Sequence, residues 1–107
     1  MDDQVLRVGA LEVRPDEFRA AIDGQALTLT VRELQLLTAL ARRQGRIVTR
    51  EELYTAVWQR PFRRNERSVD VYVKRLRRKL GTGEWIHTHY GFGYRLSQPF
   101  HISATGS

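Results

Sequence analysis

The stretch RSVDVYVKRLRRKLG, residues 67–81, decides how the rest of the chain is interpreted. At 100° per residue, four apolar side chains point within about 40° of one direction, which predicts an amphipathic helix over about 66–80. These are Val69, Val73, Leu76 and Leu80. Gly81 is a typical residue just past a helix end. The opposite face combines cations with one valine, namely Arg67, Val71, Lys74, Arg75 and Arg78.

The positive charge of the chain is concentrated around this helix. The 107 residues carry a net charge of +6, but residues 60–79 hold nine Lys and Arg against two acidic residues, a net +7, and the remainder carries −1. Solvated helix faces usually mix both signs, because like charges four residues apart destabilise a helix by about 0.2–0.5 kcal/mol per pair. A patch of one sign on a nearly neutral body therefore favours a polyanion as partner.

The valine among the cations favours duplex DNA. In the major groove, Arg forms bidentate hydrogen bonds with guanine, and a small apolar side chain contacts the methyl group of thymine. We therefore expect sequence-specific binding of double-stranded DNA with the helix over 66–80 in the major groove. The alternative is a protein-interaction module whose basic helix binds an acidic partner, and the dependence of affinity on salt and on DNA sequence distinguishes the two.

Short alternating or β-branched segments before the helices predict about four antiparallel strands between residues 5 and 29. The segments are VLRV (5–8), LEVR (11–14), FRAAI (18–22) and ALTLT (26–30). Turn signals separate them at residues 9–10, 15–16 and 23–24.

Two further helices are predicted, because the same capping box occurs at Thr30–Glu33 and Thr49–Glu52. Gly45 is expected to end the first helix, and the short connection over 44–48 should bring the two helices together as a helix-turn-helix. The inward-facing residues are expected to be Leu34, Leu36, Leu37, Leu40 and Ala41 in the first helix and Leu53, Tyr54, Val57 and Trp58 in the second.

Residues 85–96, WIHTHYGFGYRL, predict a β-hairpin around Gly91-Phe92-Gly93. A hairpin directly after a basic helix makes a wing beside it, suited to the phosphates or to a minor groove. The predicted fold class is thus α+β, a winged helix-turn-helix with an N-terminal four-stranded antiparallel sheet, three helices and a C-terminal hairpin wing. One domain is expected over 1–98, with a flexible tail over 99–107.

The residues give little indication of a membrane protein, a metal site or an enzyme. The chain has no cysteine, no apolar run of the roughly 18–20 residues that span a bilayer and no signal-like start, so a soluble cytoplasmic protein is expected. His87, His89 and His101 lack further ligands at metal-binding spacing, so no metal is expected. No nucleophile motif is present and Gly91-Phe92-Gly93 does not continue as a dinucleotide fingerprint, so neither an enzyme nor a cofactor is expected.

Spaced motifs along the chain resemble the winged-helix effector domain of OmpR/PhoB-type response regulators. The resemblance extends from about Val5 to Leu96 and includes the N-terminal strands that distinguish this family from other winged helices. The matching motifs are Thr30-Val-Arg-Glu33, Leu37, Val48-Thr-Arg50, Leu53, Val57-Trp58, Val69-Asp-Val71, Arg75-Leu-Arg77, Lys79-Leu80 and Gly91-Phe-Gly-Tyr-Arg95.

The resemblance implies a transcriptional regulator and a role for individual residues. Val71 and Arg75 are implied to meet base edges, and Asp70 to contact a base or orient an arginine. Phosphate contacts are implied for Arg67, Tyr72, Lys74 and Arg77, and also for Trp58 and for Thr88 in the wing. The loop over 59–66, with Arg60, Phe62, Arg63 and Arg64, corresponds to the segment that family members use to contact RNA polymerase. Family members typically bind direct repeats of DNA as head-to-tail pairs, and we expect a monomer in the absence of DNA.

Two departures from the family pattern stand out. Many relatives have an arginine before Gly91, where this chain has Tyr90, and Arg95 or a nearby histidine such as His89 is left as the possible substitute. Relatives also usually carry an N-terminal receiver domain that a sensor kinase phosphorylates. Nothing before Val5 matches one, which favours an excised effector domain over a stand-alone regulator.

Four aromatic residues have competing interpretations. Packing in the core is favoured for Tyr54 and Tyr94, and is as plausible as DNA contact for Trp58. Phe62 is expected either to tuck under its loop or to form an exposed protein contact.

Overall fold

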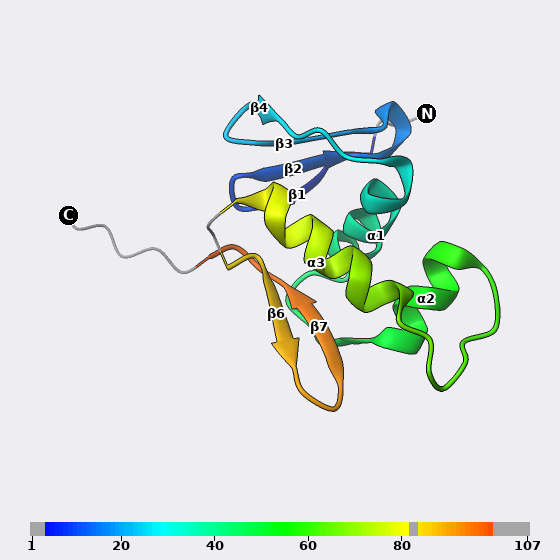
Figure 1. Ribbon diagram of the computed structural model, residues 1–107. Helices are drawn as coiled ribbons and strands as arrows, with labels where there is room; N and C mark the ends of the chain where they lie inside the picture. The colour runs from blue at the N-terminus through cyan, green and yellow to red at the C-terminus, as the bar shows by residue number, and fades with distance from the viewer. Residues whose placement is uncertain (1–3, 82–83, 100–107) are drawn as a thin grey trace.

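The computed structural model describes residues 4–81 and 84–99, in which two antiparallel sheets flank three helices (Figure 1). The predicted α+β class, the helix-turn-helix and the hairpin wing are all confirmed. The predicted tail from Phe100 onward, including His101, lies outside the described residues.

The N-terminal sheet has the strand order β1-β2-β3-β4. Its strands are β1 (Leu6–Val8), β2 (Leu11–Arg14), β3 (Arg19–Ile22) and β4 (Gln25–Ala26). The fourth strand is shorter than predicted, because the chain leaves the sheet after a hydrogen bond from Leu27 N to Ala20 O and carries Leu27 and Leu29 against the core on its way into the first helix. A short 3₁₀-helix at Pro15–Glu17 joins β2 to β3.

Helix α1 (Val31–Ala41) begins with the complete capping box predicted at Thr30. The Glu33 amide donates to Thr30 Oγ1 at 3.1 Å, and Thr30 N donates to Glu33 Oε1 at 2.9 Å. The helix ends four residues before Gly45, so the predicted end was wrong. Gly45 instead lies at the end of a turn after the helix, with φ +85°, and its amide donates to Leu96 O at 2.9 Å.

Helix α2 (Arg50–Trp58) has only half of its predicted capping box. Thr49 Oγ1 accepts from the Glu52 amide at 3.0 Å, but the Glu52 carboxylate pairs with Arg46 at 2.9 Å and Arg43 at 3.4 Å. The hydrogen bond from Arg46 lowers the pKa of Glu52 despite the opposing desolvation. Leu53, Tyr54 and Val57 are buried as predicted, whereas Trp58 is half-buried.

Helix α3 (Ser68–Leu80) packs against both other helices and passes beside the wing (Figure 1). Its buried residues are the four predicted, Val69, Val73, Leu76 and Leu80, and Gly81 follows with φ +93°. Glu66 lies just before the helix, where its carboxylate accepts from Ser68 Oγ at 2.5 Å, and this hydrogen bond lowers the pKa of Glu66.

The wing belongs to a three-stranded sheet of order β5-β7-β6, with β5 (Val48–Thr49), β6 (Ile86–His89) and β7 (Gly93–Leu96). Strand β5, which the sequence did not reveal, ties the wing to the start of α2. A side chain at position 93 would place its Cβ 1.9 Å from Val48 O, so this pairing requires glycine. The wing is thereby fixed to the helix-turn-helix at its base.

Candidate nucleic-acid interface

The outer face of α3 presents one apolar side chain among cations. Val71 is 45% exposed, and Lys74, Arg75 and Arg78 are exposed around it. The Arg75 guanidinium lies over the Tyr72 ring at 4.7 Å, which fixes it beside the same face. The predicted exposure of Val71 and Arg75 is therefore confirmed.

Two cations near the C-terminal end of α3 are engaged within the domain. Lys79 Nζ lies 2.8 Å from Glu33 Oε1, and Glu33 is only 2% exposed. Desolvation opposes ionisation of Glu33, but the hydrogen bonds from Lys79 and Thr30 outweigh it and lower its pKa. Arg77 donates to Ile86 O at 2.8 Å and to Thr88 Oγ1 at 2.7 Å, so two predicted phosphate contacts, Arg77 and Thr88, are bonded to each other across the base of the wing.

Asp70 connects three elements. Its carboxylate accepts from Arg50 Nε at 3.1 Å and Nη2 at 2.8 Å, and from Tyr94 Oη at 2.5 Å. Arg50 lies at the start of α2 and Tyr94 in β7, so the residue predicted to contact a base or orient an arginine orients Arg50. Burial and the hydrogen bond to Asp70 raise the pKa of Tyr94 to about 12, which keeps its hydroxyl protonated as a donor.

An aromatic cluster lies where α2, its following loop and α3 meet. Tyr54 stacks on Trp58 at 5.2 Å, and Phe62 and Tyr72 approach these two rings edge-on at 5.6 and 5.5 Å. Phe62 is half-buried against the core, so of its two alternatives the tucked position is found. The Arg32 guanidinium lies over the Trp58 ring at 5.1 Å. Tyr54 and Tyr94 are both buried in the core, as predicted.

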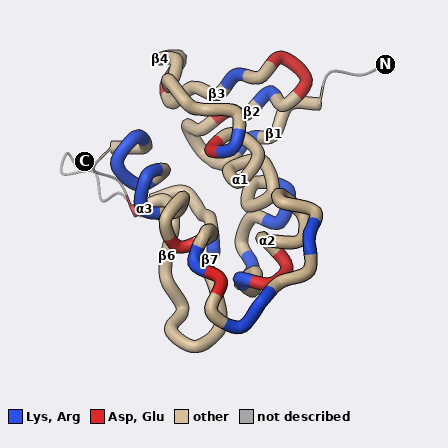
Figure 2. Tube along the Cα trace, turned by 45° about the vertical axis from the view of Figure 1, so that its right-hand side comes forward, with Lys and Arg blue, Asp and Glu red and all other residues tan. Residues whose placement is uncertain are grey.

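The loop between α2 and α3 presents the remaining cations of the basic segment. Arg60, Arg63 and Arg64 are exposed there, while Phe62 points inward. Figure 2 shows Lys and Arg positions both along α3 and along this loop. The cations thus form two basic regions, one on the outer face of α3 and one in the loop that precedes it.

The wing presents aromatic rather than cationic residues at its tip. Tyr90 is 88% exposed and Phe92 70%, on either side of Gly91. Arg95 lies in β7, away from the tip, where it donates to His89 Nε2 at 3.1 Å and to Ser97 Oγ at 3.2 Å. His89 and Arg95, the candidates to replace the usual wing arginine, are thus bonded to each other.

A hollow of about 700 Å³ separates the start of α3 from the wing. Arg67, just before α3, and Asp70 in its first turn line one side, and Tyr90 and Phe92 line the other from the wing tip. The start of α3 and the wing tip therefore face each other across this hollow.

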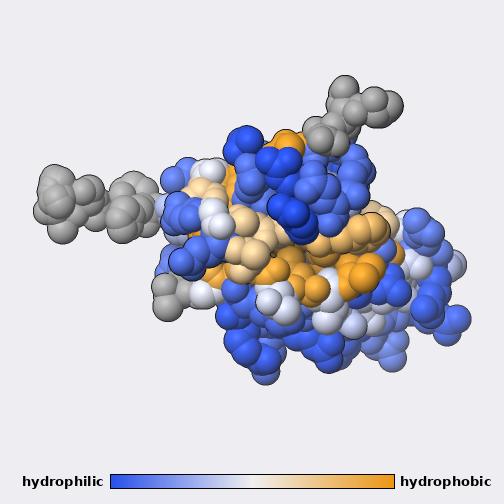
Figure 3. Space-filling model, turned by 90° about the horizontal axis from the view of Figure 1, so that it is seen from above, coloured by the Kyte–Doolittle hydropathy of each residue, from blue (hydrophilic) through white to orange (hydrophobic). Residues whose placement is uncertain are grey.

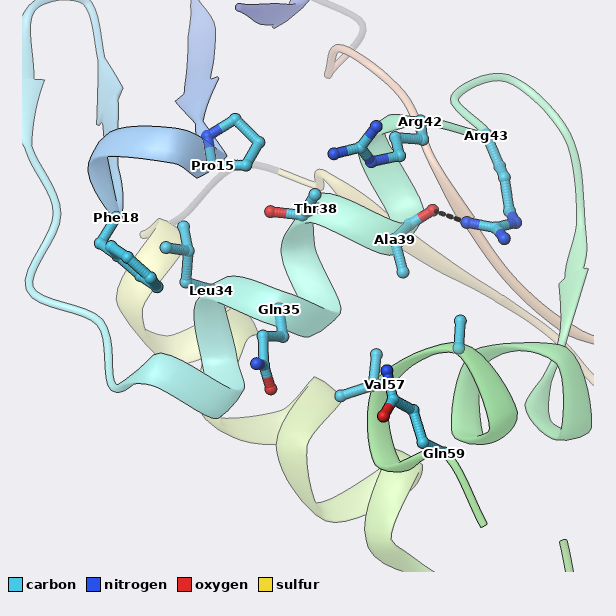
Figure 4. A pocket seen from close by; sticks show the side chains of 11 residues that line it. Pro15, Phe18, Leu34, Gln35, Thr38, Ala39, Arg42, Arg43, Val57 and Gln59 are labelled. Atoms are coloured by element: carbon cyan, nitrogen blue, oxygen red, sulfur yellow. Dashed lines mark hydrogen bonds between the residues drawn. The ribbon is translucent and has the colours of Figure 1, made fainter. Parts of the chain in front are cut away.

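A second, more apolar groove lies away from α3 and the wing. It has a volume of about 360 Å³ between the 3₁₀-helix, α1 and α2 (Figure 4). Phe18, which is 67% exposed, and Leu34 face it from one side and Val57 from another (Figure 4). Viewed from the side of the four-stranded sheet, hydrophobic side chains form a band between two hydrophilic regions (Figure 3).

The described part of the chain holds neither a metal-ion cluster nor a membrane-spanning helix. Among residues 4–81 and 84–99, no three His, Cys, Asp or Glu side chains lie close enough together to hold a metal ion. Over the same residues, none of the helices combines the length and apolarity that crossing a bilayer would require.

Comparison with known proteins identifies the family. The family model described as "Transcriptional regulatory protein, C terminal" matches residues 24–96. The alkaline phosphatase synthesis transcriptional regulatory protein PhoP of Bacillus subtilis is 37% identical over 103 residues, which cover 92% of this chain and 42% of PhoP. The chain belongs to this family of OmpR/PhoB-type DNA-binding domains. It is a DNA-binding effector domain of the response-regulator type and not an enzyme.

Solved structures of OmpR/PhoB-type domains share the fold. The DNA-binding domain of CpxR from E. coli superimposes with a TM-score of 0.82 at 34% identity, covering 91% of this chain and 99% of that one. The RstA DNA-binding domain of Klebsiella pneumoniae, solved in complex with the RstA box, gives a TM-score of 0.82 at 26% identity, covering 88% and 97%.

Sequence reasoning missed Arg50 and Glu33 as partners of interface residues. Arg50 lies 20 positions from Asp70, and Glu33 lies 46 from Lys79, so no local spacing could connect them. Glu33 belongs to the capping box of α1, and Arg50 directly follows the N-cap residue of α2. Their positions in the sequence therefore indicated only where the helices begin.

Proposed function

We propose that this domain reads duplex DNA with the outer face of α3 in the major groove, where Val71 and Arg75 contact base edges. The observation that carries the proposal is the exposed Val71 surrounded by exposed cations. A valine side chain fits against a thymine methyl, and Arg bonds guanine O6 and N7. Charge alone would attract phosphate but would not discriminate among sequences.

The proposed phosphate contacts fall into three groups. Arg67 just before α3 and Lys74 on α3 are exposed and meet the DNA backbone as cations. Arg77 and Thr88 act as a pair at the base of the wing, while Tyr72 and Trp58 reach the backbone from the edge of the aromatic cluster. Asp70 acts mainly by holding Arg50, and its remaining acceptor capacity faces the hollow between α3 and the wing.

The loop cations Arg60, Arg63 and Arg64 are proposed as a contact for RNA polymerase. Because Phe62 packs inward, the contact would be cationic rather than aromatic, which suits an acidic surface on the polymerase.

The chain spans about two fifths of the length of the relatives it matches, PhoP among them. We infer that it functions together with a receiver domain controlled by a sensor kinase. We also infer that it is monomeric when free and occupies tandem direct repeats as a head-to-tail pair.

Selection of bound duplexes from a random pool, followed by sequencing, tests the proposal. The expected result is a half-site repeated in the same orientation at a fixed spacing. A titration of affinity against salt on the selected duplex should give a log–log slope near −5, if about six phosphates are neutralised. Equal affinity for the selected and scrambled duplexes would contradict the proposal and favour binding of an acidic protein partner.

A further inference from the structure

We propose that Tyr90 and Phe92 form an aromatic wedge that enters the minor groove and unstacks a deformable base step. The inference deepens the proposed DNA-binding function and rests on it. It concerns the tip of the wing, where neither side chain is used by the fold: Tyr90 is 88% exposed and Phe92 70%.

Hairpin turns ordinarily carry small polar residues, because the tip lies in water. Here two large rings flank Gly91, whose φ of +84° makes the tight reversal and whose surroundings are open. The turn is closed by a hydrogen bond from Phe92 N to His89 O at 2.8 Å. The rings therefore project from a rigid support rather than from a loose loop.

The position of the tip indicates duplex DNA as the partner. The hollow between α3 and the wing is lined by Arg67 on one side and by Tyr90 and Phe92 on the other. A duplex whose phosphate Arg67 contacts at the start of α3 would therefore lie next to the wing tip.

An arginine, the usual side chain for a minor-groove contact, is not available at the wing tip. Arginine is attracted to the narrow groove of A-tracts, but the tip from Tyr90 to Phe92 has no cation, and Arg95 is bonded to His89 and Ser97. Apolar wedges act differently, since they separate adjacent base pairs and kink the duplex. Their preferred steps are pyrimidine–purine steps such as TA, which are the easiest to unstack.

The test uses duplexes that share the selected half-site and differ only at the step facing the wing: a TA step, an A-tract or a GC step. The chain should bind the TA duplex about tenfold more tightly than the A-tract duplex. The double variant Tyr90→Ala/Phe92→Ala should lose that preference and keep its affinity for the A-tract duplex. Tyr90→Arg should shift the preference toward the A-tract.

Unstacking is measured directly with 2-aminopurine placed at the TA step. Its fluorescence should rise when the unaltered chain binds at saturation and should not rise with the double variant. Phe18→Ala is the matched control, because Phe18 is 67% exposed but lines the groove remote from α3 and the wing. Thermal unfolding of the double variant should match that of the unaltered chain, since both rings lie outside the core.

The wedge would be overturned if the double variant kept the TA preference and gave the same rise in 2-aminopurine fluorescence as the unaltered chain. If the double variant bound a single half-site normally but lost cooperativity on tandem half-sites, the tip would be a contact with a second copy and the wedge would again be wrong. Failure of the unaltered chain and of Phe18→Ala to select any duplex would instead contradict the DNA-binding proposal itself.

Discussion

Arg50 and Asp70 join the start of α2 to the first turn of α3 through two parallel hydrogen bonds, Nε to Oδ1 at 3.1 Å and Nη2 to Oδ2 at 2.8 Å. The Tyr94 hydroxyl donates to the same carboxylate from β7. Bidentate Arg–carboxylate pairs fix orientation as well as distance. Together with the Tyr94 hydrogen bond, this pair therefore fixes α2, α3 and the wing strand β7 relative to one another, and simultaneous contact with two grooves depends on that arrangement.

We expect Asp70→Asn to lower the free energy of unfolding by about 1–2 kcal/mol, because a charge-assisted pair becomes a neutral one and the Tyr94 hydroxyl loses an anionic acceptor. Urea unfolding measures the change. Asp16→Asn, on an exposed residue of the 3₁₀-helix, is the control and should change stability by less than about 0.5 kcal/mol. Equal stability of the two variants would show that the pair does not hold the three elements together.

Arg75 and Lys74 are neighbours on α3 to which different roles are assigned. Arg75→Ala should cost about 1–3 kcal/mol of binding free energy and relax specificity at one base pair, because a bidentate base contact is lost. Lys74→Ala should weaken all duplexes alike and flatten the salt slope by about one unit. Affinities for the selected duplex and its single-base variants, measured over a range of salt, separate the two. A uniform loss across sequences in both variants would show that neither side chain reads a base.

Lys79 and Arg78 are also adjacent, yet the structure separates their roles. Lys79→Ala should lower stability by about 1–3 kcal/mol, because the buried Glu33 carboxylate loses its cationic partner. Arg78→Ala should leave stability nearly unchanged, since Arg78 is exposed. Urea unfolding gives both values, and a stable Lys79→Ala variant would place Lys79 among the free surface cations.

Glu33 also predicts a dependence of stability on pH. Its pKa is lower in the folded chain than its ordinary value of 4.5, so it contributes stability that is present above about pH 4.5 and is lost as the pH falls through the folded value. Lys79→Ala removes part of the cause of the lowered pKa, and the acid-induced loss of stability should become shallower. Unfolding free energies measured between pH 3 and 7, a range chosen to bracket the carboxylate pKa values, test this. An unchanged acid profile would assign the pH dependence to other carboxylates.

The sequence predicted those parts of the fold that depend on residues close together along the chain. The apolar face of α3 follows from the spacing of Val69, Val73 and Leu76, and the start of α1 follows from Thr30 and Glu33. The spacing could not show that β5 pairs with β7, because Val48 meets Tyr94 only once the chain has folded back on itself.

The candidate site was predictable in outline for the same reason. Helical periodicity placed Val71 and Arg75 on the outer face, but counting charges could not show that Lys79 turns toward Glu33 or that Arg77 bonds the wing. Asp70 was predicted to contact a base or to orient an arginine, and its partner Arg50 could not be predicted because their hydrogen bond depends on tertiary contacts. Which bases and phosphates these residues meet remains a prediction.

Gly93 and Gly91 lie two residues apart and should respond differently to alanine. At position 93 a Cβ would lie 1.9 Å from Val48 O, a backbone atom that cannot move without breaking the β5–β7 pairing. Gly93→Ala should therefore cost about 3 kcal/mol of stability and detach the wing from the helix-turn-helix. At position 91 the space is open and only the positive φ is unfavourable, so Gly91→Ala should cost about 1 kcal/mol. Urea unfolding compares the two costs, and amide hydrogen exchange at Tyr94 reports whether the wing is released. Equal costs, with Tyr94 still protected in Gly93→Ala, would mean that β5 does not anchor the wing.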